Sequence, residues 1–153
     1  MFTYCYNTNI GVIYIAEENG YITNISFKNI SPNSSTIIKE TPIIKDTYIQ
    51  INDYLNKKRK YFDIPYLIKG TEFQNKVWNE LLNIPYGETR SYKEIATAIN
   101  NPKSCRAVGL ANNKNPLPLI VPCHRVIGSN NKLVGYAGGL HIKEFLLKLE
   151  ENI

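Results

Sequence analysis

The chain is 153 residues long, 43% of its residues are hydrophobic and 20% are charged, and its formal net charge is +5. That length suits one domain or two small ones, and that apolar content can form a core, which excludes wholesale disorder. No stretch approaches the roughly 20 consecutive apolar residues of a membrane span, and the uncharged opening lacks the basic region of a secretory signal.

Short strands are predicted at the start of the chain. Phe2–Tyr6 and Val12–Ala16 are runs of aromatic and β-branched residues, which favour extended structure. Asn19 and Gly20 can then supply the positive φ angles of a tight hairpin that leads into a third run, Tyr21–Phe27. We therefore expect the chain to begin with a β-sheet.

A loop, a helix and one more extended stretch complete this part. Ser31–Ser35 is predicted to be a loop. Apolar residues recur at helical spacing over Ile44–Asn56, and the basic run Lys57–Lys60 is expected to be the solvated end of that helix. Tyr61–Ile68 is predicted to be extended. Because nothing in residues 1–69 has catalytic character, we interpret them as a small scaffold domain.

Two capping boxes predict helices in the second part of the chain, residues 70–153. Thr71 and Gln74 form the first box, in which an N-cap Thr and a Gln three residues later satisfy each other's exposed backbone amides. Ser91 and Glu94 repeat the pattern before a shorter helix. With strands in the first part and helices in the second, the predicted fold class is α+β.

A third short helix follows the turn at Asn100–Pro102. Ser104 is predicted to cap it, and it runs to about Asn113. Two short helices joined by a tight turn fit a helix-turn-helix that binds DNA, although any helical hairpin has the same spacing. The third helix is rich in small residues and carries one long side chain, Arg106, which suggests binding by backbone and shape rather than by base sequence.

A long stretch of the second part contains no acidic residue. Between Glu94 and Glu144, 49 residues pass without an Asp or a Glu. The stretch holds six basic residues and both histidines of the chain: Lys103, Arg106, Lys114, Arg125, Lys132, Lys143, His124 and His141. Chance is the alternative explanation, but we interpret the stretch as a positive face for a polyanion, because each Lys or Arg at a phosphate releases counterions and adds affinity.

The three cysteines, Cys5, Cys105 and Cys123, are too few and too scattered for a disulfide framework or a paired zinc site. We therefore expect a reducing, cytoplasmic environment. Cys5 and Cys105 are expected to be small buried hydrophobes. Cys123 differs because His124 and Arg125 follow it, and positive neighbours favour the nucleophilic thiolate.

Cys123 lies near the end of Asn115–Val126, a segment stiffened by prolines. We predict that this segment is a rigid, buried strand. Because side chains alternate along a strand, direct contact between Cys123 and His124 is not assumed, and a bridging water is the expected link between them.

The sequence around Cys123 resembles a known family. Pro122–Val126 reads Pro-Cys-His-Arg-Val, and motifs that match the same family flank it over about residues 70–150. These motifs are Ile84–Thr89, Ser91-Tyr92, Arg106–Gly109, Asn115-Pro116 and Gly135–Gly139. Together they resemble the O6-alkylguanine-DNA alkyltransferases, also called methylated-DNA–protein-cysteine methyltransferases. Residues 1–69 agree with this family only in size and β-rich character.

This resemblance implies a fold and an activity. The fold would be a ribonuclease H-like domain at residues 1–69, followed by a winged helix-turn-helix-like domain at residues 70–153 that carries the active site. The protein would move an alkyl group from O6 of guanine in double-stranded DNA to its own cysteine, with O4 of thymine left open as a second source. The product is a stable thioether, so each molecule would act once, as a monomer, without a cofactor and without strong sequence preference.

The resemblance also implies catalytic roles. Cys123 would accept the alkyl group, His124 would act on it through a water, and Glu150 would orient the histidine. Asn115 would support the turn before the active segment. Tyr92 would lie over the phosphate and the rotated base.

Further residues would contact the DNA or the base. Arg106 would fill the space that the flipped base leaves. The guanine pocket would be walled by Pro118, Val126, Tyr136 and Ala137. Backbone groups of Cys123, Val126 and Ala137 would read the guanine edge. The DNA backbone would be touched by Lys93, Asn101 and Ser129.

Some positions depart from the family's pattern. Leu110 replaces a second glycine in the third helix, and Asn130 and Asn131 stand where a glycine often turns the chain. Asn tolerates the left-handed region, so we expect that turn to survive. The zinc site of some members needs more Cys and His than residues 1–69 contain, so no metal is expected.

Three other functions stay open at this point. A non-enzymatic lesion-binding protein would share the DNA-binding parts but would replace the nucleophile. A Cys–His hydrolase would turn over repeatedly through an acyl-enzyme. A plain helix-turn-helix regulator would show strong sequence preference and would not need Cys123.

Overall fold

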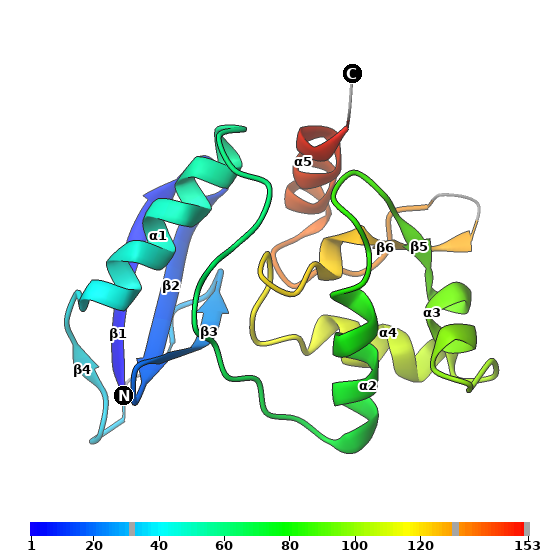
Figure 1. Ribbon diagram of the computed structural model, residues 1–153, viewed down its shortest axis with the longest axis horizontal. Coiled ribbons are helices and arrows are strands. Elements are labelled where there is room, and N and C mark those ends of the chain that lie inside the picture. Colours follow the sequence, from blue (N-terminus) through cyan, green and yellow to red (C-terminus); the bar gives the residue numbers. More distant parts are fainter. Residues whose placement is uncertain (31–32, 130–131, 152–153) are drawn as a thin grey trace. The chain divides into compact units, whose positions relative to one another are not determined.

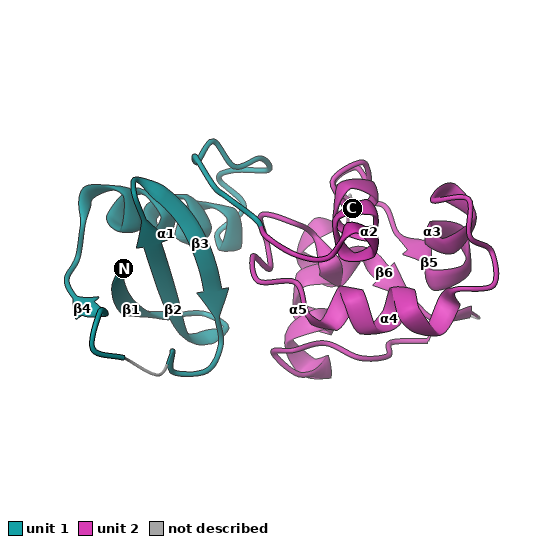
Figure 2. Cartoon of the chain, turned by 90° about the horizontal axis from the view of Figure 1, so that it is seen from below, with its two compact units in different colours: residues 1–68 teal, residues 69–153 magenta. Residues whose placement is uncertain are grey.

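The computed structural model describes residues 1–30, 33–129 and 132–151 (Figure 1). The chain divides into two compact units, Met1–Ile68 and Lys69–Ile153 (Figure 2). The long strands lie in the first unit and most of the helices in the second, so the architecture is the expected mixed α+β. Among the described residues, no helix combines the length and apolar character that a membrane span needs.

A four-stranded sheet forms the first unit, in the order β3-β2-β1-β4. β1 (Phe2–Thr8), β2 (Gly11–Glu18) and β3 (Tyr21–Ser26) are antiparallel neighbours, which confirms the three predicted strands. The hairpin between β2 and β3 uses the expected positive-φ pair, because φ is 54° at Asn19 and 83° at Gly20.

One helix, α1 (Pro42–Leu55), packs on a face of this sheet (Figure 1). It begins two residues before the predicted start, because the Thr41 side chain caps the Ile44 amide and Pro42 fits the first turn. Helix and sheet enclose a core of large buried side chains: Ile13, Ile15, Ile22, Ile44, Ile51 and Tyr54.

The remaining segments of the first unit are irregular. β4 (Ile37–Ile38) pairs parallel with β1 and is too short to show a pattern in the sequence. Of the predicted loop, Ser31 and Pro32 lie outside the described residues. In the predicted extended stretch Tyr61–Ile68, regular pairing is limited to one bridge to β3.

The two cysteines expected to be buried are not. Cys5 is exposed on β1, next to Tyr4, which is 37% exposed, so this part of the strand is solvated. Cys105 is half-buried, because it is the first residue of a helix whose opening turn lies at the surface.

In the second unit, both predicted capping boxes are present. α2 (Glu72–Leu81) begins at Thr71, whose hydroxyl oxygen accepts a hydrogen bond from the Gln74 amide at 3.1 Å, while the Gln74 side chain accepts one from the Thr71 amide at 3.0 Å. α3 (Tyr92–Ala98) begins with the second box in the same way. These local signals therefore fix where both helices start.

α4 (Cys105–Asn113) lies where the third helix is predicted, and Ser104 occupies its N-cap position, but the Ser104 side chain makes no capping hydrogen bond. The Ser104 hydroxyl donates to the Asn101 carbonyl at 2.6 Å, and its φ and ψ of −98° and 22° are not the extended angles of a capping residue. α4 packs against both α2 and α3, and the buried Trp78 indole donates to the Ala111 carbonyl at 2.9 Å.

The predicted strand before Cys123 is also wrong. The chain forms a turn in which Leu119 has a φ of 78° and the Val121 amide donates to the Leu117 carbonyl at 2.9 Å. It then enters a short 3-10 helix, η1 (Cys123–Arg125), directly after Pro122. The prolines restrict the backbone of the segment as expected. Because proline has no amide hydrogen, they also remove donors that the hydrogen bonds between paired strands would need.

Three further elements complete the second unit. β5 (Arg90–Ser91) and β6 (Val126–Ile127) form a parallel pair, and α5 (Leu140–Glu150) packs against η1. The core of the second unit is a set of fully or almost fully buried side chains: Val77, Trp78, Leu81, Ile95, Val108, Leu117, Val126 and Leu146. This packing brings the end of α5 to the residues of η1.

Candidate active site

Asn115 shapes the turn that presents Cys123. Its Nδ2 donates to the Val121 carbonyl at 2.8 Å, and its Oδ1 accepts from the Leu117 amide at 2.9 Å. One buried side chain thus closes the turn from both sides. The Cys123 amide donates to the Val121 carbonyl at 2.7 Å, which fixes the start of η1.

The Cys123 thiol lies almost completely inside the protein, at 4% exposure. Burial raises its pKa to about 11, against smaller lowering effects of the Asn115 hydrogen bond, the Lys143 charge and its own backbone. The expectation that His124 and Arg125 favour the thiolate is therefore wrong, because burial dominates. The resting group is a thiol, which needs a base before it can attack.

Glu150 joins His124 and Arg125 in a buried network. Its Oε2 lies 2.8 Å from His124 Nε2, and its two oxygens accept from Arg125 Nε at 2.8 Å and Nη2 at 2.9 Å. Arg125 Nη1 also donates to the Ile84 carbonyl at 2.7 Å. The two-pronged contact neutralises a carboxylate that is only 2% exposed. Sequence reasoning paired Glu150 with His124 but missed this use of Arg125.

The network sets the protonation of His124. Burial lowers its pKa, the hydrogen bond and charge of Glu150 raise it, and the charges of Arg125 and Lys143 lower it again, with a lowered pKa as the result. The imidazole is therefore neutral at neutral pH. Because an ionised carboxylate can only accept, Nε2 carries the hydrogen and Nδ1 carries the lone pair. A neutral imidazole of this kind can act as a general base.

Tyr92 borders both the active turn and the surface. Its hydroxyl donates to the Val134 carbonyl at 3.0 Å. Burial raises the pKa of the phenol, the charge of Cys123 raises it further, and a hydrogen bond from Asn112 lowers it. The side chain also lines a surface hollow described below.

Lys143 is a buried residue to which sequence reasoning gave no place in the site. Its ammonium group donates to the carbonyls of Val126 at 2.5 Å, Val134 at 2.9 Å and Gly135 at 3.4 Å. Burial lowers its pKa to about 8, while the charge of Cys123 raises it. The available signal was its place on the apolar side of α5, near the buried Ile142.

Four of the residues expected at the DNA line one hollow of about 530 Å³: Tyr92, Lys93, Arg106 and Ser129. Gly109, on the same helix as Arg106, also lines it, and a side chain there would meet the Tyr92 ring at 3.8 Å. The hollow therefore joins α3, α4 and the segment after β6 into one surface that carries the cations Lys93 and Arg106.

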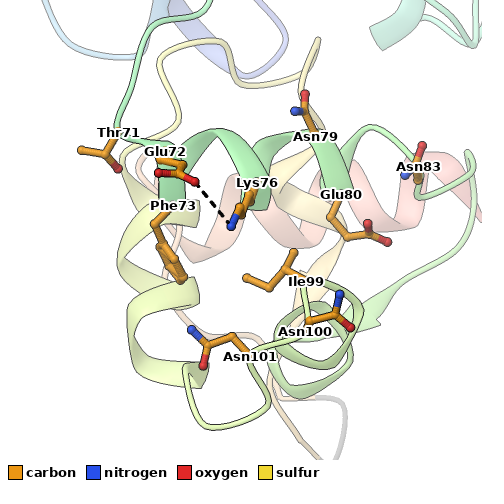
Figure 3. A pocket seen from close by; sticks show the side chains of 10 residues that line it. All are labelled: Thr71, Glu72, Phe73, Lys76, Asn79, Glu80, Asn83, Ile99, Asn100 and Asn101. Carbon is orange, nitrogen blue, oxygen red and sulfur yellow. Dashed lines mark ion pairs between the residues drawn. The ribbon is translucent and has the colours of Figure 1, made fainter.

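Asn101 lies outside this hollow. It borders a second hollow of about 860 Å³ between α2 and the turn that follows α3 (Figure 3). Figure 3 shows that the α2 side of this hollow carries the pair Glu72 and Lys76, whose charged atoms lie 3.7 Å apart. Asn101 therefore lines a different hollow from the other residues expected to touch DNA.

The positive surface is smaller than the acid-free stretch predicts. Arg125, Lys143 and His124 are buried, because they serve the internal network and the carbonyl cluster. Four basic residues of the stretch are exposed: Lys103, Arg106, Lys114 and Lys132. Within the described residues, no group of three or more His, Cys, Asp or Glu side chains could hold a metal ion.

The residues expected to wall a guanine pocket differ in exposure. Pro118 and Val126 are buried, Tyr136 is half-buried and Ala137 is exposed. Leu110, which departs from the family's pattern, is 59% exposed on α4, so its apolar side chain lies at the helix surface. The predicted turn at Asn130 and Asn131 lies outside the described residues.

Fold and site together define a class: an α+β protein whose helical unit holds a buried cysteine, a buried His–Glu–Arg network and a hollow lined by Lys93 and Arg106. Comparison with known proteins identifies the family. The sequence model described as "6-O-methylguanine DNA methyltransferase, DNA binding domain" matches residues 72–152. The chain belongs to the methylated-DNA–protein-cysteine methyltransferase family.

Relatives match almost the whole chain. The methylated-DNA–protein-cysteine methyltransferase of Methanosarcina acetivorans is 49% identical over 98% of each chain, and the constitutive one of Bacillus subtilis is 47% identical over 94% of this chain and 91% of that one. The crystal structure of Mycobacterium tuberculosis OGT in complex with DNA has a TM-score of 0.91 at 40% identity, over 99% of this chain and 93% of that one.

Proposed function

We propose that this protein repairs DNA by moving an alkyl group, such as methyl, from O6 of guanine to the sulfur of Cys123. The proposal rests on the turn that Asn115 closes, because this turn presents the buried Cys123 thiol. The next residue, His124, lies within hydrogen-bond distance of the Glu150 carboxylate. The near full-length relatives, all named methylated-DNA–protein-cysteine methyltransferases, support it.

The first step is removal of the thiol proton. With a pKa near 11, Cys123 is almost entirely protonated at neutral pH. Nδ1 of neutral His124 takes this proton through a bridging water. Glu150 then stabilises the resulting imidazolium, as the carboxylate of a catalytic triad does. Arg125 keeps Glu150 ionised throughout.

The second step is an in-line displacement at the alkyl carbon. The S–C bond forms while the bond from that carbon to O6 breaks, and the electron pair stays on guanine. The Tyr92 hydroxyl supplies a proton to the departing base. Water does not hydrolyse the thioether product, so each molecule acts once and needs no cofactor.

The nucleotide must leave the duplex before O6 can be reached, at a cost of a few kcal/mol. We place the duplex on the hollow lined by Tyr92, Lys93, Arg106 and Ser129, where positive charge binds phosphates. Arg106 fills the gap left by the base, which enters between the pocket residues Pro118, Val126, Tyr136 and Ala137. Asn101, which lines the second hollow, would contact the DNA backbone outside the hollow of Arg106.

Finer features of the fold follow from this assignment. We assign α3 and α4 as a helix-turn-helix, with the β5–β6 pair and the chain after it as its wing. The first unit, a sheet covered by α1, would be a ribonuclease H-like scaffold domain. A reducing compartment such as the cytoplasm suits a protein whose single reaction needs a free thiol.

A Cys123→Ser variant tests the proposal. On duplex DNA carrying a labelled O6-methylguanine, it should transfer no label, because a neutral hydroxyl is a far weaker nucleophile than a thiolate. Its affinity for the duplex should stay within about threefold, less than 1 kcal/mol. The control is Cys5→Ser, which removes an exposed thiol of the first unit and should transfer normally. Label transfer by Cys123→Ser would reject the proposal.

A further inference from the structure

A run of four cations, Lys57–Lys60, follows α1 and has no part in the site described above. Residues 54–62 contain these four cations and no acidic residue. Lys57, Lys58 and Lys60 are exposed, and Arg59 is half-buried. None of the ion pairs between described residues includes Lys57 or Lys58. The end of α1 therefore presents a dense positive charge to solvent, which we call the basic patch.

Backbone hydrogen bonds, and not these side chains, close the end of α1. The Lys58 amide donates to the Asp53 carbonyl at 2.8 Å, and the Lys57 amide donates to the Tyr54 carbonyl at 3.2 Å. The two bonds form a Schellman motif, which satisfies the last carbonyls of a helix. The attraction between cations and the helix dipole falls off within one turn. Helix termination alone does not explain four consecutive cations.

Lys57 lies where the backbone of this motif turns left-handed. Its φ is 61°. Glycine is usual at this position and asparagine is tolerated, because positive φ disfavours a residue with an ordinary β-carbon. A lysine here opposes the local backbone preference. The property that it adds, and that glycine or asparagine would lack, is its charge.

A side-chain hydrogen bond holds the turn that carries the patch. Arg59 Nη1 donates to the Tyr61 carbonyl at 3.0 Å. Tyr61 itself is 73% exposed. Lysine ammonium groups and tyrosine hydroxyls both donate to the phosphate oxygens of nucleic acids. The patch and Tyr61 thus combine clustered cations with an exposed phenol on a short, hydrogen-bonded turn.

We propose that the basic patch is a second contact surface for DNA, at which Lys57, Lys58 and the Tyr61 hydroxyl bind phosphate oxygens of a duplex. The inference rests on the proposed function, which supplies a polyanion as partner. It adds a surface of the first unit to a protein whose other expected DNA contacts lie in the second unit. Because phosphate contacts carry no base information, the patch should add affinity without sequence preference.

The salt dependence of binding to unmethylated duplex DNA tests the proposal. The test variant combines Lys57→Asn with Lys58→Gln. Each lost phosphate contact should lower the slope of log affinity against log salt by about 0.9, so the slope should fall by about 1.8. Affinity at about 0.1 M salt should fall about tenfold or more. An unchanged slope would overturn the proposal.

A matched control removes the same charge from other positions of the first unit. Lys28→Gln with Lys45→Gln takes away two exposed lysines, one after β3 and one near the start of α1, and should leave the slope unchanged. An equal fall of the slope in both double variants would mean that net charge matters and not this patch, which would also overturn the proposal.

Thermal unfolding separates a lost contact from a lost fold. Because asparagine tolerates the left-handed backbone at position 57, the test variant should unfold at the same temperature as the unchanged chain or at a higher one. If it unfolds at a lower temperature, Lys58→Gln alone must still lower the slope by about 0.9. A single variant that is stable and keeps the full slope contradicts the proposal.

Vesicles that contain phosphatidylserine test a different partner. If the test variant loses affinity for such vesicles while its slope on DNA is unchanged, the patch binds lipid and the proposal is wrong. Methyl transfer to Cys123 tests the proposed function separately. If the unchanged chain transfers methyl and the slope does not depend on the patch, only this inference fails. If the unchanged chain does not bind duplex DNA, both fail.

Discussion

Cys123 is a buried thiol whose reactivity depends on its neighbours rather than on its own acidity. Its raised pKa keeps it protonated at rest, so alkyl transfer needs a base, and this is the role that we propose for the neutral His124. Glu150 in turn depends on Arg125 for its charge. The chemistry of one sulfur thus rests on three further side chains, and each can be tested alone.

The rate of alkyl transfer should fall in acid as His124 becomes protonated. Burial lowers the pKa of this histidine from its ordinary 6.5, so the midpoint of the fall should lie below pH 6.5. A lowered pKa also means that the contribution of His124 to stability is lost as pH falls through the same window. Single-turnover rates on a methylated duplex between about pH 5 and pH 8 measure this midpoint. A midpoint at or above 6.5 would contradict the burial argument.

Glu150→Gln should damage both stability and activity. It leaves the Arg125 guanidinium buried opposite a neutral amide, and breaking a buried ion pair from one side costs about 3–5 kcal/mol. Urea denaturation measures the loss, and Glu151→Gln, at the exposed neighbouring position, is the matched control. If both variants unfold at the same urea concentration, the buried network does not stabilise the fold.

At the scale of elements, Lys143 joins α5 to β6 and to the segment between them. Its three carbonyl partners lie in β6 and in the segment before α5. The Val134 carbonyl accepts from both Lys143 and Tyr92. The position of the Tyr92 hydroxyl is therefore coupled to the buried ammonium group.

Lys143→Met should loosen this segment. The carbonyls it leaves without donors cost about 1–3 kcal/mol each if they stay buried, so residues 132–139 should open to solvent and transfer should slow. Amide hydrogen exchange of those residues measures the opening. Lys148→Met, on the same helix but with a side chain that is 69% exposed, should change neither property. Unchanged exchange in Lys143→Met would show that the cluster does not hold the segment.

The elements also show which structural features the sequence can predict. The strands of the hairpin and the helices opened by Thr71 and Ser91 depend on neighbours within a few residues, so local patterns predict them. The turn before Cys123 depends on Asn115 and on prolines that remove ladder hydrogens, and a run of apolar residues there looks like a strand.

The site was predictable to the extent that its motifs are local. The resemblance named Cys123, His124, Glu150 and Tyr92, and the structure brings Glu150 of α5 to His124 and places Tyr92 of α3 within the electrostatic influence of Cys123. It could not reveal that Lys143 and Arg125 point inward, because the acid-free stretch gives the same sequence pattern for a buried cation as for one on a DNA-binding face. Burial is decided by packing between distant segments.

At the scale of the whole molecule, the helical unit combines a positively charged hollow with an internal nucleophile. The exposed Arg106 and Lys93 lie at the hollow, whereas Cys123 lies inside. This division matches a protein that binds a polyanion at its surface and draws one nucleotide into its interior. The transfer consumes the cysteine.

The most direct test is the intact mass of the protein after incubation with an excess of duplex DNA that contains O6-methylguanine. Each molecule should gain one methyl group on the peptide that holds Cys123, and repair should stop at one equivalent. Repair beyond one equivalent, or an unmodified protein after repair, would contradict this prediction.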